Sequence, residues 1–276
     1  MSNFRILPRN IADEAVMGAP SPALLSTLPE SNLLTQPRLE VARTDGLATQ
    51  VISCTWPTNQ KASMVALCRH NLTSGGTIRA QLYSDEALSS QLVDSSSVAA
   101  FSTSGFAQVD ADDYLEDDFR AMKNWVFHFA EQTTVRGLKI TLTDASNPDG
   151  YMEASRLFVG SYFEATYNVP MGGYGLMQET LTSQGRDDGG GLISDRGGDF
   201  RTLRLDLSMI AEDDVPEFCA IARRLGKHRD FWFDLYPEVA GAEAGYLRGQ
   251  FKFTDLGPLE KPEYAQFRRA LVLGEV

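Results

Sequence analysis

The stretch from residue 134 to residue 165 constrains the fold of this chain more than any other. Residues 138–143 alternate between apolar and polar side chains, so one face of a strand can enter a core while the other meets water. Residues 144–150 (DASNPDG) are rich in turn-forming types. Residues 156–164 form an apolar run suited to burial on both sides. Together these features predict two strands paired as a hairpin.

Several segments of the first half of the chain resemble a known family. The strings VRGLKITLTD and ASRLFVGSYFEA are similar to the closing strands of galactose-binding-like (discoidin-type) jelly rolls, as found in phage tail and virion structural proteins. LPESNLLT and ASMVALCRHNLTSGGTIRAQLYSD look like opening strands of the same domain. The likeness spans residues 28–168. It implies a β-sandwich over residues 46–168, and residues 1–45, interrupted by five prolines, are expected to form an extended arm over other structure.

The second half predicts a different kind of domain. Residues 202–209 alternate cleanly as a strand, a glycine-rich segment precedes them at 185–191, and residues 213–225 have the apolar spacing of a helix that Gly226 ends. The strings FRTLRLDLSMI, EDDVPEFCAIARRLG and FWFDLYP are similar to the split-barrel domain of phage tail tubes and distal tail rings. The likeness implies that residues 169–276 are a β-rich ring-forming domain with one packed helix, and that the glycine-rich segment reaches a neighbouring subunit.

Composition limits the partners. The 276 residues include 25 Lys and Arg against 37 Asp and Glu, a net charge of −12. Non-specific nucleic-acid binding is therefore not expected, because a phosphate-binding surface needs clustered cations. No apolar run approaches the roughly 20 residues of a membrane span, and the N-terminus does not resemble a secretory signal. The three cysteines have no CxxC spacing and are expected to be buried thiols of a protein made in the host cytoplasm. A disulfide between Cys54 and Cys68 on neighbouring strands is the less favoured alternative.

A calcium site is one candidate in the loop after the alternating strand. Asp144, Asn147 and Asp149 place three oxygen-bearing side chains at short spacing, and oxygen ligands suit Ca²⁺. Discoidin-type domains often carry a structural calcium, so the resemblance supports this interpretation. The spacing is not that of an EF-hand, and ordinary turn chemistry is the favoured alternative. No other cofactor is expected.

A glycan site is the second candidate. Sugar recognition needs an exposed aromatic face with polar side chains beside it. Trp56, next to Pro57 in an expected loop, is predicted to be that platform, with Arg69, His70 and Asn71 as polar neighbours. Tyr114 and Trp125 are weaker aromatic candidates. Core packing is the competing interpretation for both tryptophans.

Catalytic chemistry is not predicted. The three histidines have no partners at metal-ligand spacing, no GxSxG motif is present, and the glycines at 185–198 lack the Gly-Lys-Ser/Thr of a phosphate loop. An acidic run at residues 110–118 is typical of a solvated loop, with a cation site or an interface for a basic partner as alternatives. The chain is therefore expected not to be an enzyme.

Three hypotheses about function follow. The first is a structural component of a bacteriophage tail, located at the tail tip or distal tail region of the virion. Its expected partners are copies of itself in a ring and other tail proteins. Host-surface glycan is expected as a further contact. The alternative is a freestanding carbohydrate-binding module that uses Trp56. The third, which the sequence favours least, is a hydrolase whose site lies in the acidic run.

Overall fold

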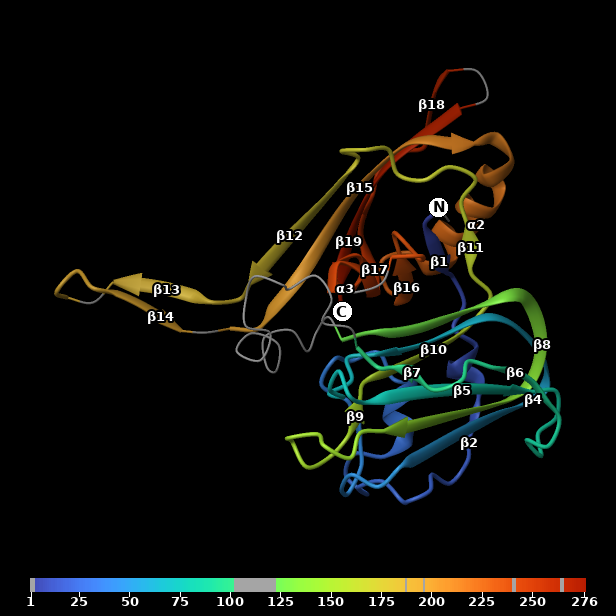
Figure 1. Ribbon diagram of the computed structural model, residues 1–276. Helices are drawn as coiled ribbons and strands as arrows, with labels where there is room; N and C mark the ends of the chain where they lie inside the picture. The colour runs from blue at the N-terminus through green and yellow to red at the C-terminus, as the bar shows by residue number, and fades with distance from the viewer. Residues whose placement is uncertain (1–2, 102–122, 187, 196, 240–241, 264–265) are drawn as a thin grey trace. The chain divides into compact units, whose positions relative to one another are not determined.

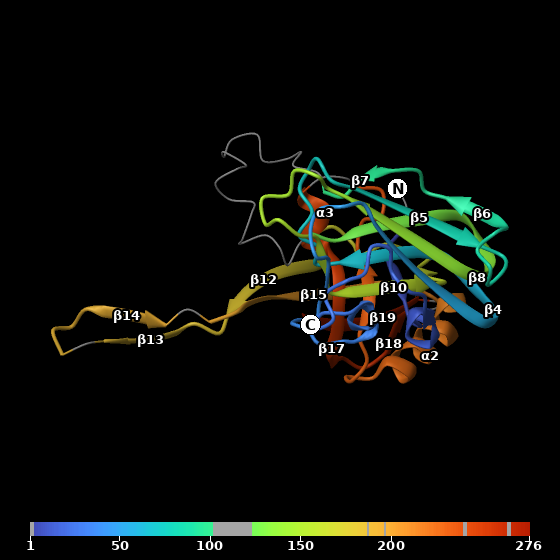
Figure 2. The same ribbon diagram turned by 90° about the horizontal axis from the view of Figure 1, so that it is seen from below.

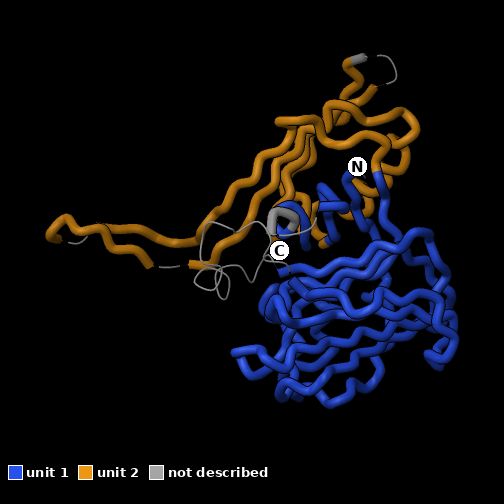
Figure 3. The backbone as a smooth tube through the Cα atoms, viewed as in Figure 1, with its two compact units in different colours: residues 1–164, 231–250 blue, residues 165–230, 251–276 orange. Residues whose placement is uncertain are grey.

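The computed structural model describes residues 3–101, 123–186, 188–195, 197–239, 242–263 and 266–276 (Figure 1). The chain divides into two compact units (Figure 3). Unit 1 comprises residues 1–164 and 231–250, and unit 2 comprises residues 165–230 and 251–276. Residues 231–250 were predicted to lie in the second domain, whereas the structure groups them with unit 1.

Unit 1 is built on an antiparallel sheet of seven strands. The order along the main path is β10, β4, β8, β5, β6, with β2 paired to β4 and β7 paired to β5. The strands are β2 (Val16–Met17), β4 (Gln50–Cys68), β5 (Thr77–Tyr83), β6 (Gln91–Asp94), β7 (Val98–Ala99), β8 (Trp125–Thr143) and β10 (Arg156–Gly160). Smaller pairings complete the unit. β3 (Ala42–Arg43) pairs with β9 (Glu153–Ala154), and β1 (Arg5–Leu7) pairs with both β11 (Phe163–Glu164) and β16 (Phe231–Asp234).

The two longest strands of unit 1, β4 and β8, pair along most of their 19 residues each. Sequence patterns predict two separate strands in each of these segments, with a loop at Pro57. The structure instead has one continuous strand in each segment, with register irregularities between Thr55 and Gln60 and between Ala62 and Met64 of β4. Proline lacks an N–H, so a break in the ladder is where a strand accommodates it.

The predicted hairpin between residues 134–143 and 156–164 is wrong. Residues 134–143 belong to β8, which pairs with β4 and β5, whereas β10 pairs with the other edge of β4, with Arg156 opposite Cys68. Phe163 and Glu164 form the separate strand β11, which pairs with β1. The connecting segment includes β9, which pairs with β3. Turn residues indicate where a chain reverses, but they do not determine which strand it then joins, because that depends on non-local packing.

The core of unit 1 lies on both faces of its sheet. One face carries a large apolar cluster that includes Trp56, Val65 and Leu157. The other carries Met64, Phe158 and Trp232. Alternate residues of β4 and β10 enter these two clusters. The predicted burial on both sides is therefore confirmed for residues 156–160, whereas Tyr162 and Glu164 are half-buried. The jelly-roll β-sandwich expected for this region is the observed fold class.

Short elements of the N-terminal 45 residues also enter the unit 1 core. The 3₁₀ turn η1 (Ile11–Glu14) contributes Ile11 and Ala12, and η2 (Glu30–Leu34) contributes Leu33. The side chain of Asn10 accepts a hydrogen bond from the Ala12 N–H at 3.2 Å and caps η1. The prolines that interrupt regular structure therefore leave pieces that still bury apolar side chains.

Unit 2 is a smaller antiparallel sheet with one packed helix. Its strands lie in the order β12, β15, β19, β17, and β18 pairs with β19. Their bounds are β12 (Tyr174–Thr180), β15 (Asp199–Ala211), β17 (Arg248–Leu256, which begins in unit 1), β18 (Glu260–Glu263) and β19 (Gln266–Glu275). A separate pair, β13 (Ser183–Arg186) and β14 (Leu192–Asp195), is inserted between β12 and β15.

The helix α2 (Val215–Leu225) confirms the predicted helix, and a 3₁₀ turn, η4 (Glu212–Asp214), precedes it. Phe218, Ile221 and Leu225 are buried on one side of α2. Gly226 has φ +52° and ends the helix, as expected for a residue without a Cβ. A short helix that was not predicted, α3 (Ala242–Leu247), lies within residues 231–250 and therefore belongs to unit 1.

Candidate functional site

Trp56, the predicted glycan platform, is completely buried. Its indole Nε1–H donates a hydrogen bond of 2.7 Å to the carbonyl of Ile11 in η1. The ring therefore fills the unit 1 core and cannot stack on a sugar. The prediction of an exposed Trp56 is wrong because Pro57, which suggested a loop, lies instead at the irregularity of β4.

The three polar residues predicted to accompany Trp56 are buried as well. Arg69, with φ +50°, donates from Nη1 to Oε1 of Gln250 at 3.1 Å, and His70 is fully enclosed. Asn71 donates to the Tyr151 carbonyl at 3.0 Å and accepts from the Glu153 N–H at 2.8 Å. Asn71 thus holds the chain between β8 and β9 in place, and this triplet is structural rather than ligand-facing.

The residues predicted to bind calcium form a turn. The Asp144 carboxylate accepts hydrogen bonds from the Thr73 N–H at 2.7 Å and from the Thr73 hydroxyl at 3.1 Å. Asn147 donates to Asp144 at 3.3 Å, and Asp149 accepts from Asn71 at 2.7 Å. Each of these carboxylates is directed at protein donors. Within the described ranges, no three His, Cys, Asp or Glu side chains gather in a way that could hold a metal ion.

The remaining aromatic and acidic candidates are Trp125, Tyr114 and the acidic run. Trp125 is buried in the unit 1 core. Tyr114 and the acidic run at 110–118 lie outside the described residues. Across the described part of the chain, no helix is long and apolar enough to cross a membrane.

A buried charged group in unit 1 was not foreseen from the sequence. Asp234, which is 1% exposed, lies 3.5 Å from Nε2 of His128 and 3.5 Å from Nε of Arg248. Tyr162 packs edge-on against the His128 ring, and Arg5 lies over Tyr162. Burial lowers the pKa of His128, and Asp234 opposes that shift. No local signal could reveal this group, because His128 and Asp234 are 106 residues apart.

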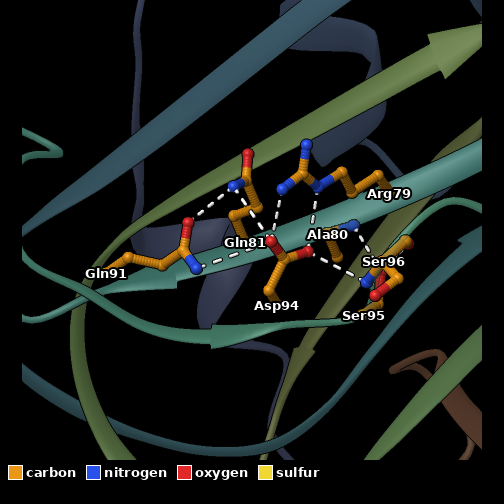
Figure 4. A network of polar contacts seen from close by, with 7 residues as sticks. All are labelled: Arg79, Ala80, Gln81, Gln91, Asp94, Ser95 and Ser96. Carbon is orange, nitrogen blue, oxygen red and sulfur yellow. Dashed lines mark hydrogen bonds and ion pairs between the residues drawn. The ribbon is translucent and has the colours of Figure 1, made fainter.

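A second polar network lies at the edge of the unit 1 sheet (Figure 4). The Asp94 carboxylate accepts from the Arg79 guanidinium, from the Ser96 N–H at 2.9 Å and from Gln81 at 3.4 Å. The hydrogen bond from Arg79 is the main cause that lowers the pKa of Asp94 to about 2. Since protein donors surround the carboxylate, the network fastens β6 to β5.

An exposed hairpin is the most unusual surface feature of unit 2. We call the described residues from 181 to 198 the arm. All eight residues of its strands β13 and β14 are exposed, and the pair extends away from the other strands of unit 2 in both views (Figures 1 and 2). Three large apolar side chains, Leu181, Leu192 and Ile193, are 71%, 60% and 58% exposed.

The second surface feature of unit 2 is a cavity of about 550 Å³, which we call the hollow. It is lined by residues of the strands β12, β15 and β19, among them Arg204, Asp206 and Val272. Space in the hollow is left by small lining residues, namely Gly172, Gly173, Gly175 and Ala270. Its charged lining residues are Arg204, Asp206, Glu260, Arg268 and Arg269.

Comparison with known proteins gives structural matches alone. No protein-family model matches the chain, and no curated protein is significantly similar to it. A Streptococcus pneumoniae fucose-binding module is 13% identical, with 55% of this chain and 94% of the module covered and a TM-score of 0.38. The family 32 carbohydrate-binding module of C. perfringens NanJ, in complex with galactose, is 12% identical, with 58% and 99% covered and a TM-score of 0.39.

A third match is chitosan-binding module 1 of a chitosanase/glucanase from Paenibacillus sp. IK-5. It is 11% identical, with 55% of this chain and 99% of the module covered and a TM-score of 0.39. These identities and TM-scores are too low to carry a function over to this chain. The class that the fold and surfaces define is a mainly β protein of two units with an exposed β arm.

Proposed function

We propose that this chain is a non-catalytic structural subunit that assembles with copies of itself through β-rich surfaces of unit 2. The arm is the observation that carries the proposal. A two-stranded hairpin is marginally stable alone in water, and no face of β13 or β14 is buried against the described chain. Burial of Leu181, Leu192 and Ile193 by a neighbour would supply the missing stabilisation.

The edge of the unit 2 sheet supports the same proposal. Within unit 2, β12 pairs with β15 on one side, and most of its residues are exposed, including Tyr174 and Met177. An exposed strand edge with apolar side chains favours pairing with another chain. A subunit interface that covers β12 and the arm would remove both exposed features together.

The setting we propose is the tail of a bacteriophage virion, at the tail tip or distal tail region. This finer proposal rests on the resemblance of both halves of the sequence to tail proteins. Other tail proteins would be the remaining partners, and the chain would be made in the host cytoplasm before it joins the particle.

Labelling of virions tests this setting. Antibody or gold labelling in negative-stain images, combined with mass spectrometry of purified particles, is expected to place the chain at the tail end. Particles that contain the other tail proteins but lack this chain would contradict the virion setting.

Glycan binding by unit 1 is the second candidate function. With Trp56 buried, Tyr151 is a partly exposed ring within the β8–β9 loop, and the Arg43 guanidinium lies 4.1 Å from the ring centroid. An aromatic ring with polar neighbours suits a shallow sugar site. Glycan-array binding that is lost in Tyr151→Ala and kept in Tyr151→Phe would support this function. Equal binding by both variants would count against it.

A further inference from the structure

The arm and the hollow lie at opposite ends of the same two strands. Tyr174, opposite Leu205, lines the hollow, whereas Thr180, opposite Asp199, lies at the base of the arm. The seven residues of β12 separate the two features by about 20 Å. Because the arm continues away from the rest of unit 2, a chain cannot place the tip of its own arm in its own hollow (Figures 1 and 2).

The hollow has a local excess of positive charge in a chain whose net charge is −12. Its lining includes three arginines against Asp206 and Glu260. Arg268 donates to Glu260 at 2.6 Å, and Arg269 donates to the Gly257 carbonyl at 2.8 Å. Among the described residues, the Arg204 guanidinium has no hydrogen bond or ion pair. Arg204 is thus the cation of the hollow that is available to a ligand.

The tip of the arm carries a carboxylate and little side-chain bulk. Nη1 of Arg186 donates to the Gly190 carbonyl at 2.7 Å and closes the turn between β13 and β14. Asp188 is exposed, and Gly189, Gly190 and Gly191 carry no side chains. The tip therefore presents a narrow backbone with a carboxylate, and Arg186 is already engaged within it.

We propose that the arm tip of one copy docks in the hollow of the next, where Asp188 pairs with Arg204. This inference rests on the proposed assembly function and names the surfaces that it uses. The contact is heterologous, since two different patches meet, and repetition of such a contact generates a closed ring or an open filament. Charge-assisted bidentate geometry makes arginine the suitable partner for a carboxylate at such a contact.

Cysteine cross-linking in the full chain tests the contact directly. Cys54 and Cys68 are buried thiols as expected, but Cys219 is exposed, contrary to the expectation for all three cysteines. Cys219 is therefore first replaced by serine (Cys219→Ser). Asp188→Cys combined with Arg204→Cys is expected to give a ladder of covalent oligomers on a non-reducing gel after mild oxidation. The matched control combines Asp188→Cys with Lys227→Cys, which places the second thiol on an exposed residue outside the hollow.

Charge reversal gives a second, non-covalent measurement. Asp188→Arg alone or Arg204→Asp alone is expected to weaken self-association in sedimentation experiments roughly fivefold, which corresponds to ~1 kcal/mol. The double variant is expected to restore it. These exposed positions lie outside the core, so the single variants should fold normally, and circular dichroism checks this.

The outcomes separate this inference from the proposed function. A cross-linking yield for the Asp188–Arg204 pair no higher than the control, or charge reversal that the double variant does not rescue, would overturn docking in the hollow. Labelling of the chain in virion tails would still support the structural role in that case. Cross-links that form from Arg204→Cys to a different tail protein, and not to the arm, would assign the hollow to another occupant and would also overturn the inference.

Discussion

Unit 1 and unit 2 each contain a pair of neighbouring antiparallel strands, and the two pairs differ in what stabilises them. β4 and β8 bury side chains on the faces of a sheet between two apolar clusters. β13 and β14 form the same kind of ladder, yet all their residues are exposed. Both strand pairs thus have backbone hydrogen bonds. The burial of apolar side chains distinguishes a strand pair that its own chain stabilises from a pair that needs a partner subunit.

The largest effect that tests this comparison is expected from Trp56. Trp56→Ala should lower the free energy of unfolding by ~3–5 kcal/mol, because it leaves a cavity in the unit 1 core and removes the hydrogen bond to Ile11. Leu192→Ala, the matched truncation in the arm, should change it by less than ~0.5 kcal/mol. Urea denaturation of both variants measures this. A Trp56→Ala variant of unchanged stability would contradict the buried position.

The next largest effect on the free energy of unfolding is expected from a glycine substitution in unit 1. Gly160 of β10 has φ +155°, and a Cβ added there would lie 2.6 Å from the Arg9 carbonyl oxygen. Gly160→Ala should therefore cost ~1–3 kcal/mol in chemical denaturation, from steric overlap and backbone strain. Gly185→Ala in the arm is the control, because no heavy atom lies within 4 Å of the added Cβ. Equal costs at the two positions would contradict the close packing of β10 against Arg9.

A smaller effect is expected from the buried histidine of unit 1. Because burial holds the pKa of His128 below its ordinary 6.5, the unfolded chain binds more protons in that range, and stability should fall as pH decreases below 6.5. His128→Gln should flatten this part of the profile of unfolding midpoint against pH. His228→Gln, at an exposed position, is the control and should leave the profile as in the wild type. A wild-type profile that is flat between pH 7 and pH 5 would contradict this role.

The smallest effect is expected at Asp94. Its pKa is about 2 in the folded chain, against an ordinary 3.8, so its contribution to stability is present above pH 3.8 and is lost as pH falls toward 2. Solvent screening reduces the effect, since the network lies at the surface. Asp94→Asn should remove this acid step in thermal unfolding, whereas Asp195→Asn in the arm should retain it. An identical acid step in Asp94→Asn would show that other carboxylates account for it.

Local patterns predicted the parts of the fold that depend on local sequence. The alternation at 202–209 indicated the strand β15, and the apolar spacing at 215–225 indicated α2. The pairing of β10 with β4 was missed, because it joins residues about 90 positions apart with no signal in either segment. The burial of Trp56 was missed for the same reason. Its hydrogen-bond partner, Ile11, belongs to the N-terminal segment 1–45, which was expected to be extended over other structure.

The candidate site was harder to predict than the fold. Polar residues such as Asn71 and Asp144 have the composition of a binding loop, and whether they face solvent or their own backbone depends on hydrogen bonds that form only in the folded chain. The glycine-rich segment at 185–191 was recognised as unusual. The sequence did not show that exposed apolar residues flank it, because Leu192 and Ile193 are equally compatible with a buried strand.

The return of residues 231–250 to unit 1 has a consequence for synthesis on the ribosome. Trp232 completes one apolar cluster of unit 1, and β16 is a partner strand of β1. Domains usually fold in the order in which they emerge. Here the N-terminal sandwich has to wait, with part of its interior uncovered, until most of unit 2 has been translated. Nascent chains are therefore exposed to premature self-association for longer than if the sandwich were formed by the N-terminal residues alone.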